Sequence, residues 1–219
     1  MKAWTVAWCA ALVCGAAAAG GLRPEKMGDW TIVVAEDASP AERYAAEEFQ
    51  GLFRGLTGLD LPVAARARGG SKTVSIGPGA AARAERLSFD ASGMGEESLR
   101  VRIGRNSIVI AGGRPRGTLY GVYEFFERYC GVRFLTADDT HFPDRTALPR
   151  LMNADFSYTP PFSFRWSYYK ENSDRPDFAA RMRVNTVVKE EKMGGSTRQT
   201  LIGHSYCRWI TTEKYGQTH

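Results

Sequence analysis

The first candidates for chemistry are two adjacent carboxylates, Glu190 and Glu191. A pair of carboxylates can serve as general acid and general base when their surroundings push the two pKa values apart. They follow residues 185–189, which we predict to be a strand, and successive strand residues point to opposite faces. Both side chains could therefore enter one pocket only if a loop reoriented them. Because Lys189 and Lys192 flank them, we expect a solvated charged loop and no catalytic pair.

The histidines do not form a metal-binding pattern. His141, His204 and His219 are too dispersed for a metal site, whose ligands usually come at close spacing. No serine or cysteine nucleophile has a recognisable partner arrangement either. We therefore expect no metal, no cofactor and no catalytic residue in this chain.

The loop Gly112-Gly113-Arg114-Pro115-Arg116-Gly117 lies between a predicted strand and a predicted helix, where exposed amides favour anions. Its spacing fits neither common phosphate-binding fingerprint. Thr118 stands where a Walker loop has lysine, and the dinucleotide pattern G-x-G-x-x-G is absent. We expect a tight strand-to-helix turn.

Residues 1–19 have the three parts of a secretory signal peptide. Lys2 provides the positive start, residues 3–13 are almost entirely apolar, and residues 16–19 are alanines that suit cleavage. A membrane span needs about 20 apolar residues, and glycines interrupt this run too early. A lipid anchor at Cys14 would follow a valine, which is bulkier than such sites usually accept. We expect an exported protein, secreted or periplasmic, with no membrane span after signal removal.

Two cysteines remain after this segment, Cys130 and Cys207. Two distant cysteines make neither a disulfide scaffold nor a zinc site. An oxidising compartment would permit one disulfide between them. Two unrelated buried thiols are the alternative that we favour.

The composition is that of a folded globular protein, with 219 residues, 43% hydrophobic and 24% charged. The net charge of +5 comes mainly from arginine. Because no basic stripe with interleaved aromatics is present, we expect no nucleic-acid partner.

Strand and helix patterns alternate between residues 30 and 135. Ser39 and Glu42 form a capping box for a helix that ends at Gly58, and residues 118–129 form a second principal helix. A short helix is predicted at 80–87. Strands are predicted at residues 30–35, 61–64, 73–76, 98–103, 107–111 and 132–135, with 98–103 and 107–111 paired as an antiparallel hairpin. We predict a mixed-sheet α/β sandwich, one domain over residues 28–151.

A family resemblance rests on four segments of this domain, the longest of which reads RGTLYGVYEFFE from Arg116 to Glu127. The others cover residues 45–49, 56–58 and 108–112. Together they resemble the N-terminal accessory domain of bacterial glycoside hydrolases, as found before the barrel in alpha-glucuronidases and beta-N-acetylhexosaminidases. The domain is most similar to that of a large uncharacterised bacterial family with a glycosidase-like barrel. The resemblance implies an accessory domain that is not the seat of catalysis.

Residues 160–219 have the pattern of a second domain. A proline pair is followed by a predicted strand at 162–167, a helix at 177–184 and a strand at 185–189, which fits the opening of a (β/α)₈ barrel. The aromatic strand with Arg165 also resembles the barrel opening in that family. A complete barrel takes roughly 200 residues or more. We therefore expect an incomplete barrel, cut at His219, although a genuine short protein with a loose extension is the rival interpretation.

Three residues of this second region are candidates for substrate binding. The resemblance implies that His204 faces a sugar pocket, with Tyr206 beside it, and a surface or buried structural histidine is the alternative. Arg165 could pair with the carboxylate of an acidic sugar, for which a bidentate guanidinium is well suited. It could equally hold the bottom of a barrel together. The aromatics of residues 166–169 could stack on sugar rings or pack at a domain junction.

Two functions therefore remain. The first is the N-terminal part of an exported glycoside hydrolase that acts in polysaccharide degradation, with carbohydrate as its partner and with its catalytic carboxylates outside this chain. The second is a non-catalytic secreted carbohydrate-binding or assembly module. Under the first function, the chain alone has no glycosidase turnover.

Overall fold

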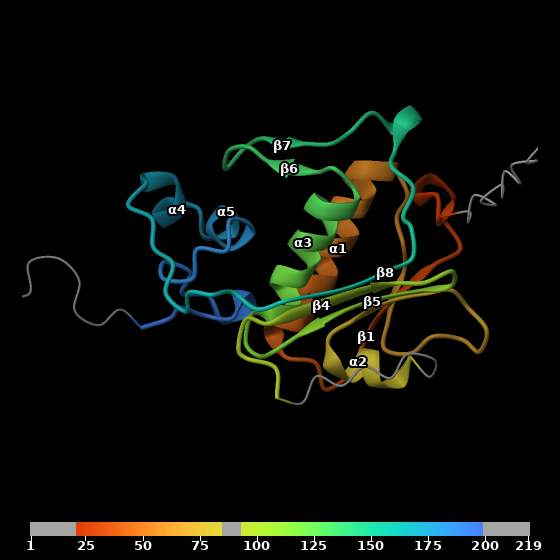
Figure 1. Ribbon diagram of the computed structural model, residues 1–219, viewed down its shortest axis with the longest axis horizontal. Helices are drawn as coiled ribbons and strands as arrows, with labels where there is room; N and C mark the ends of the chain where they lie inside the picture. The colour runs from red at the N-terminus through yellow and green to blue at the C-terminus, as the bar shows by residue number, and fades with distance from the viewer. Residues whose placement is uncertain (1–20, 85–92, 199–219) are drawn as a thin grey trace, which may run out of the picture.

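A six-stranded mixed sheet forms the centre of the molecule in the computed structural model, which describes residues 21–84 and 93–198 (Figure 1). Its strand order is β2-β1-β3-β5-β4-β8. The strands β2, β1, β3 and β5 are parallel, whereas β4 runs antiparallel to both β5 and β8. The strands are β1 (Thr31–Val34), β2 (Val63–Ala64), β3 (Thr73–Ile76), β4 (Leu99–Ile103), β5 (Ser107–Gly112) and β8 (Ala154–Tyr158).

Helices cover both faces of this sheet. The long helices α1 (Pro40–Thr57) and α3 (Gly117–Tyr129) lie together on one face, and the short α2 (Pro78–Arg83) lies on the other (Figure 1). The smaller elements are η1 (Pro24–Lys26), β6 (Arg133–Phe134), β7 (Thr140–His141), η2 (Arg145–Ala147), α4 (Lys170–Asp174), α5 (Pro176–Arg181) and η3 (Glu191–Met193). The predicted mixed-sheet α/β fold is confirmed.

The first turn of α1 is fixed by its own sequence. The Ser39 hydroxyl accepts a hydrogen bond from the Glu42 amide at 3.3 Å, and Oε2 of Glu42 accepts one from the Ser39 amide at 3.0 Å. This reciprocal pair is the predicted capping box, and it satisfies two backbone donors that a helix start would otherwise leave unpaired. Gly58 ends the helix at φ 81°, a left-handed conformation that glycine adopts without strain.

Aromatic packing between α1 and α3 forms the centre of the core. The Phe49 ring centroid lies 5.8 Å from that of Phe53, 5.5 Å from that of Phe125 and 5.1 Å from that of Phe126, and all four side chains are buried. Each fully buried side chain of this size contributes about 1.5–3 kcal/mol through the hydrophobic effect. The two long helices are therefore packed together through buried aromatic side chains.

The sheet differs from the prediction at one edge. The hairpin of β4 and β5 is confirmed, with Val101 opposite Ile110. The strand expected at 132–135 does form as β6, but it pairs with β7 in a separate two-stranded sheet. The outer position beside β4 is taken by β8, which was not predicted. Its residues are mostly exposed, so they lack the apolar run by which the other strands were recognised.

The two strands predicted at 162–167 and 185–189 are not formed, and this part of the prediction is wrong. The two segments do meet, because the Asn185 amide donates to the Arg165 carbonyl at 3.3 Å. The Arg165 amide, however, donates to the side-chain Oδ1 of Asn185 at 2.9 Å. A side chain thus takes the place of a ladder acceptor, and neither segment gains a further strand partner within the described residues. The predicted helix at 177–184 forms over Pro176–Arg181 as α5.

Several predictions fall outside the described residues. These are the signal peptide at 1–19 and the residues His204, Tyr206, Cys207 and His219. Cys130 is fully buried at the end of α3. Within residues 21–84 and 93–198, no helix is both long enough and apolar enough to cross a membrane.

Candidate functional site

A buried carboxylate, Glu97, joins the α/β domain to the segment that follows β8. It lies two residues before β4, at the sheet end nearest the first turn of α3, and is 7% exposed. A carboxylate at this depth requires charged or polar partners, because burial of an unpaired charge is costly.

Three donors from distant parts of the chain satisfy this carboxylate. Its Oε1 accepts from Nε of Arg116 at 2.8 Å and from Nδ2 of Asn185 at 2.8 Å. Its Oε2 accepts from the guanidinium of Arg165. Arg116 and Asn185 are 3% and 0% exposed, so two of the three partners are as deeply buried as the acid.

Arg116 extends the connection to the chain after η3. Its guanidinium donates to the carbonyls of Gly194 at 3.2 Å and Gly195 at 3.0 Å, and to the hydroxyl of Thr197 at 2.7 Å. A Cβ atom at Gly194 would lie 2.3 Å from Cγ of Arg116. Glycine at this position therefore allows the backbone to approach the arginine.

The glycine loop before α3 positions Arg116. A Cβ atom at Gly113 would lie 1.9 Å from the Gly95 carbonyl, and one at Gly117 would lie 2.2 Å from the Ser98 carbonyl. The amide of Gly113 donates to Ser98, and that of Gly117 donates to Glu96 and to Gly113. Because these amides already have protein acceptors, the loop is the tight turn that the sequence predicted, and its amides are not arranged as a phosphate cradle.

Tyr120, in the first turn of α3, lies beneath this ion cluster. Burial, followed by the negative charge of Glu97, raises the pKa of Tyr120 to about 12. The Arg165 guanidinium carbon lies 5.8 Å from the centre of the tyrosine ring. The Tyr120 hydroxyl has no hydrogen-bond partner among the described residues. The phenol therefore stays neutral at physiological pH and serves the cluster as a packing surface.

The arrangement favours a structural role for Glu97. A general acid needs a carboxyl oxygen within hydrogen-bond reach of the substrate, whereas both carboxylate oxygens of Glu97 already accept hydrogen bonds from protein donors. Loss of one partner from a buried ion pair is strongly destabilising, by about 3–5 kcal/mol. The cluster of Glu97, Arg116, Arg165 and Asn185, which we term the junction cluster, thus holds the segment after β8 against the α/β domain.

A second set of ion pairs connects the same two regions. Arg181 at the end of α5 donates to both carboxylate oxygens of Glu48 on α1, at 3.0 and 3.2 Å. Arg183 forms ion pairs with Glu124 and Glu127 on α3. Arg183 also has a positive φ of 56°, which is uncommon for a residue with a side chain. The two long helices α1 and α3 are therefore tied to the α5 region.

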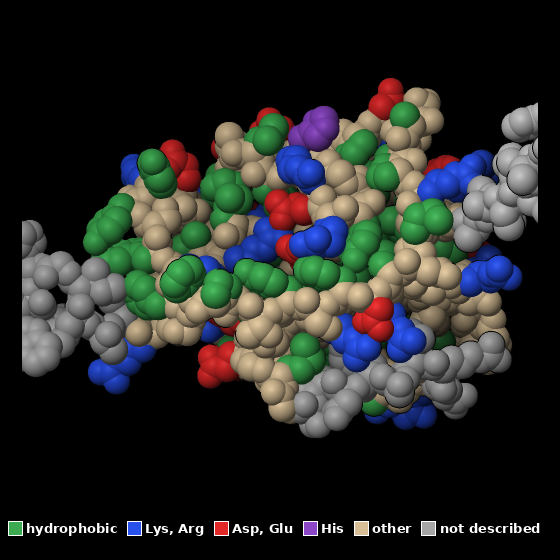
Figure 2. Space-filling view, viewed as in Figure 1, with side chains coloured by type: hydrophobic (Ala, Val, Ile, Leu, Met, Phe, Trp, Pro, Cys, Tyr) green, Lys and Arg blue, Asp and Glu red, His purple; other side chains and the backbone are tan. Residues whose placement is uncertain are grey.

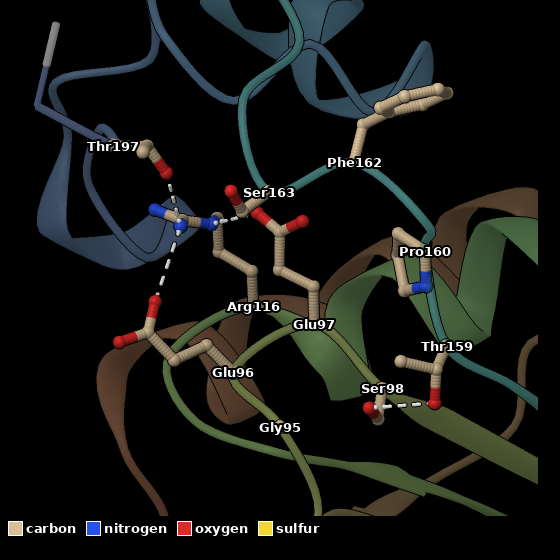
Figure 3. A pocket seen from close by; sticks show the side chains of 10 residues that line it. All are labelled: Gly95, Glu96, Glu97, Ser98, Arg116, Thr159, Pro160, Phe162, Ser163 and Thr197. Carbon is tan, nitrogen blue, oxygen red and sulfur yellow. Dashed lines mark hydrogen bonds and ion pairs between the residues drawn. The ribbon is translucent and has the colours of Figure 1, made fainter.

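A cavity of about 250 Å³ opens beside the junction cluster (Figure 3). Its wall includes the hydroxyl residues Ser98, Thr159, Ser163 and Thr197, together with Phe162. Ser98 Oγ and Thr159 Oγ1 are 3.0 Å apart and hydrogen-bonded. In Figure 3 the Phe162 ring is turned outward, away from the Arg116 and Glu97 side chains.

Of the candidate residues predicted from the sequence, Arg165 is the one that the structure places in this site. Arg165 belongs to the junction cluster, where it donates to Glu97, to the Arg183 carbonyl and to the Phe162 carbonyl. His204 and Tyr206 lie outside the described residues. Glu190 and Glu191 are exposed, as expected of a solvated loop. Within the described residues, no group of three or more histidine, cysteine, aspartate and glutamate side chains is placed to hold a metal ion.

Sequence reasoning missed Glu97 and the role of Arg116. Arg116 begins the most specific segment of the family resemblance, which was the one available signal for it. Glu97 lies in a short glycine-rich and acidic stretch that reads as a surface turn. Glu97 is buried only because two arginines and an asparagine from other parts of the chain contact it.

The comparison with protein-family models agrees with the resemblance found in the sequence. Residues 22–125 match the family model "Glycosyl hydrolase family 67 N-terminus". No curated protein matches the chain. A family GH115 4-O-methyl-alpha-glucuronidase is similar in structure, with a TM-score of 0.49 and 13% identity over 72% of this chain and 24% of that one.

Two hexosaminidases are also similar in structure. The Streptomyces plicatus beta-hexosaminidase gives a TM-score of 0.44 with 20% identity, over 71% of this chain and 29% of that one. The GH20 beta-N-acetylhexosaminidase of Streptomyces coelicolor A3(2) gives 0.46 with 19% identity, over 73% and 30%. The chain thus spans less than a third of the length of each of these solved structures. Over residues 22–125, the α/β domain of this chain thus matches the N-terminal domain of glycosyl hydrolase family 67.

Proposed function

We propose that this chain is the N-terminal part of an exported glycoside hydrolase that acts in polysaccharide degradation. The match of residues 22–125 to the N-terminal domain of a glycosyl hydrolase family carries this proposal. The accessory domain spans residues 28–151, and residues 160–219 begin the (β/α)₈ barrel. Residues 1–19 direct export as a cleaved signal peptide, so the protein is secreted or periplasmic.

The accessory domain acts by holding the start of the barrel in one orientation. The junction cluster and the ion pairs of Arg181 and Arg183 connect three elements of the domain with the segment after β8. Catalytic carboxylates come from later barrel strands, as in the resembling families. His204, Tyr206 and Arg165 remain candidates for contact with the sugar.

Two measurements test this function. Sequencing the gene past the codon of His219 should show a reading frame that continues for about 200 residues or more, the size a barrel requires. The purified 219-residue protein should show no turnover of aryl α-glucuronides or aryl N-acetyl-β-glucosaminides. A stop codon directly after His219, or robust turnover by this chain alone, would contradict the proposal.

The second candidate function is a non-catalytic secreted module that binds carbohydrate. One observation favours it, namely the exposure of large aromatic side chains in the segment after β8. Phe162, Tyr168 and Tyr169 are 70%, 77% and 76% exposed. This function predicts glycan binding by the chain whether or not the gene encodes a barrel.

A further inference from the structure

A row of exposed aromatic side chains runs along the segment between β8 and α4. Tyr158 at the end of β8 is 44% exposed, and Phe162, Tyr168 and Tyr169 are at least 70% exposed. Figure 2 shows hydrophobic side chains gathered in a line over this part of the molecule. Single exposed apolar residues are ordinary, but a contiguous group marks an interaction surface.

The rings of this row support one another. The Trp166 and Tyr168 ring centroids lie 4.2 Å apart at an interplanar angle of 33°, and Phe164 meets Trp166 edge-on at 6.3 Å. Among the described residues, none of the aromatics at 162–169 belongs to the hydrophobic core or to the side chains packed against it. We call Tyr158, Phe162, Phe164, Trp166, Tyr168 and Tyr169 the aromatic row. Phe164, Trp166 and Tyr168 are in ring contact with one another, and the rings at 162–169 take no part in the core.

The hydroxyl-lined cavity lies beside this row, and Phe162 belongs to both. The Thr197 hydroxyl accepts a hydrogen bond from Arg116, so its own proton remains available to donate. Ser98 and Thr159 use one hydroxyl proton for the bond between them, which leaves the other proton and several lone pairs for a ligand. The cavity wall can therefore both donate and accept.

The charges of the cavity disfavour an anionic ligand. Arg116 is 4% exposed and paired with Glu97, whereas Glu96 in the same wall is 76% exposed. An approaching ligand therefore meets the carboxylate of Glu96 before it meets any cation of the wall. A uronic acid carboxylate would be repelled, while a neutral hydroxyl could donate to Glu96.

We propose that the cavity and the aromatic row together bind a neutral oligosaccharide. A pyranose ring has hydroxyls around its edge and C–H groups on its faces. The cavity wall offers partners for the hydroxyls of one sugar, and the aromatic faces offer a stacking surface for the C–H groups of the sugars that follow. This inference rests on the second candidate function and gives it a place and a ligand class.

A polypeptide partner fits these observations less well. The anchors of a protein interface are buried in apolar pockets of the partner and surrounded by a ring that excludes water. Here the rings form a line, and serines at 163 and 167 lie between them in the sequence. Phe162 borders the cavity whose wall carries hydroxyl groups. That combination of apolar faces and hydroxyls matches a sugar chain.

Isothermal titration calorimetry of the 219-residue protein tests the site. The neutral probes are cello-, xylo-, manno- and chitohexaose, and oligogalacturonate is the anionic probe. We expect saturable binding of at least one neutral hexasaccharide and none of oligogalacturonate. The double variant Tyr168→Ala/Tyr169→Ala and the single variant Phe162→Ala should each weaken binding at least tenfold.

Leu135→Ala is the matched control, because Leu135 is an exposed apolar residue, 57% exposed, outside the row. Its affinity should equal that of the unchanged protein, and circular dichroism should show that all variants remain folded. Binding that survives the tyrosine substitutions, or no binding of any neutral probe, overturns the proposal. A dimer in sedimentation experiments that the tyrosine substitutions dissociate, without sugar binding, would assign the row to a second copy and also overturn it. None of these outcomes depends on whether the gene continues past His219. The sugar-binding proposal and the hydrolase proposal can therefore be refuted independently of each other.

Discussion

Nε of Arg116 lies 2.8 Å from Oε1 of Glu97, and the two side chains are 4% and 8% exposed. The pair joins the start of α3 to the turn before β4, and Asn185 and Arg165 add hydrogen bonds to Glu97 from the segment after β8. This contact joins the α/β domain to the segment after β8.

Replacement of Glu97 by glutamine should destabilise the protein by about 3–5 kcal/mol, because it leaves the buried guanidinium of Arg116 without its counter-charge. Urea denaturation measures this loss. Limited trypsin digestion should also cleave faster at the arginines of 160–198. Glu96→Gln is the matched control, since Glu96 is 76% exposed and lies 3.9 Å from the same arginine. It should change stability by no more than about 0.5 kcal/mol. Equal effects of the two substitutions would contradict a structural role for Glu97.

Two glycine substitutions should act in opposite directions. Gly113→Ala places a Cβ atom 1.9 Å from the Gly95 carbonyl, so the loop that positions Arg116 must shift. We expect a loss of about 1–3 kcal/mol. Gly51→Ala, in the interior of α1, meets no atom within 4 Å and should stabilise the protein by about 0.5–1 kcal/mol. Thermal unfolding of both variants tests whether the first substitution lowers stability and the second raises it. A stabilising Gly113→Ala would show that the loop is not tightly packed.

Acid should weaken the edge of the sheet. Hydrogen bonds from Arg100 on β4, at 2.8 and 2.9 Å, lower the pKa of Asp155 on β8 below its ordinary value of 3.8. A carboxyl whose pKa is lower in the folded state stabilises the protein above its unfolded pKa. That contribution is lost as the pH falls through the folded value.

The acid effect of this pair is small because Asp155 is 42% exposed, so it amounts to at most about 1 kcal/mol. Asp155→Asn should reduce stability more at pH 7 than at pH 2, because acid protonates the carboxyl of the original protein and removes its ion pair with Arg100. Urea unfolding at the two pH values measures the difference. Equal losses of stability at both pH values would mean that the effect of the substitution does not come from the ion pair.

The Cys130 thiol should be unreactive in the folded protein. The side chain is fully buried, and this burial raises its pKa, so little of the reactive thiolate forms at pH 8. The Cys207→Ser variant, without residues 1–19, has Cys130 as its one cysteine. Ellman's reagent should modify it only after denaturant is added. Rapid modification of the native variant would place the thiol on the surface.

The sequence by itself determined the elements whose cause is local. The capping box of α1 needs only Ser39 and Glu42, three residues apart, and the β4–β5 hairpin needs only the short turn between its strands. The RGTLYGVYEFFE segment likewise identified the domain type before any contact was known.

The tertiary structure decided what depends on distant partners. Glu97 contacts Arg116, Arg165 and Asn185, which are 19, 68 and 88 positions away in the chain. No sequence pattern near Glu97 predicts any of these three contacts. The same reason explains the two strands that did not form at 162–167 and 185–189. A strand exists only where a neighbour supplies the other half of its hydrogen bonds, and at Arg165 the side chain of Asn185 supplies that acceptor instead.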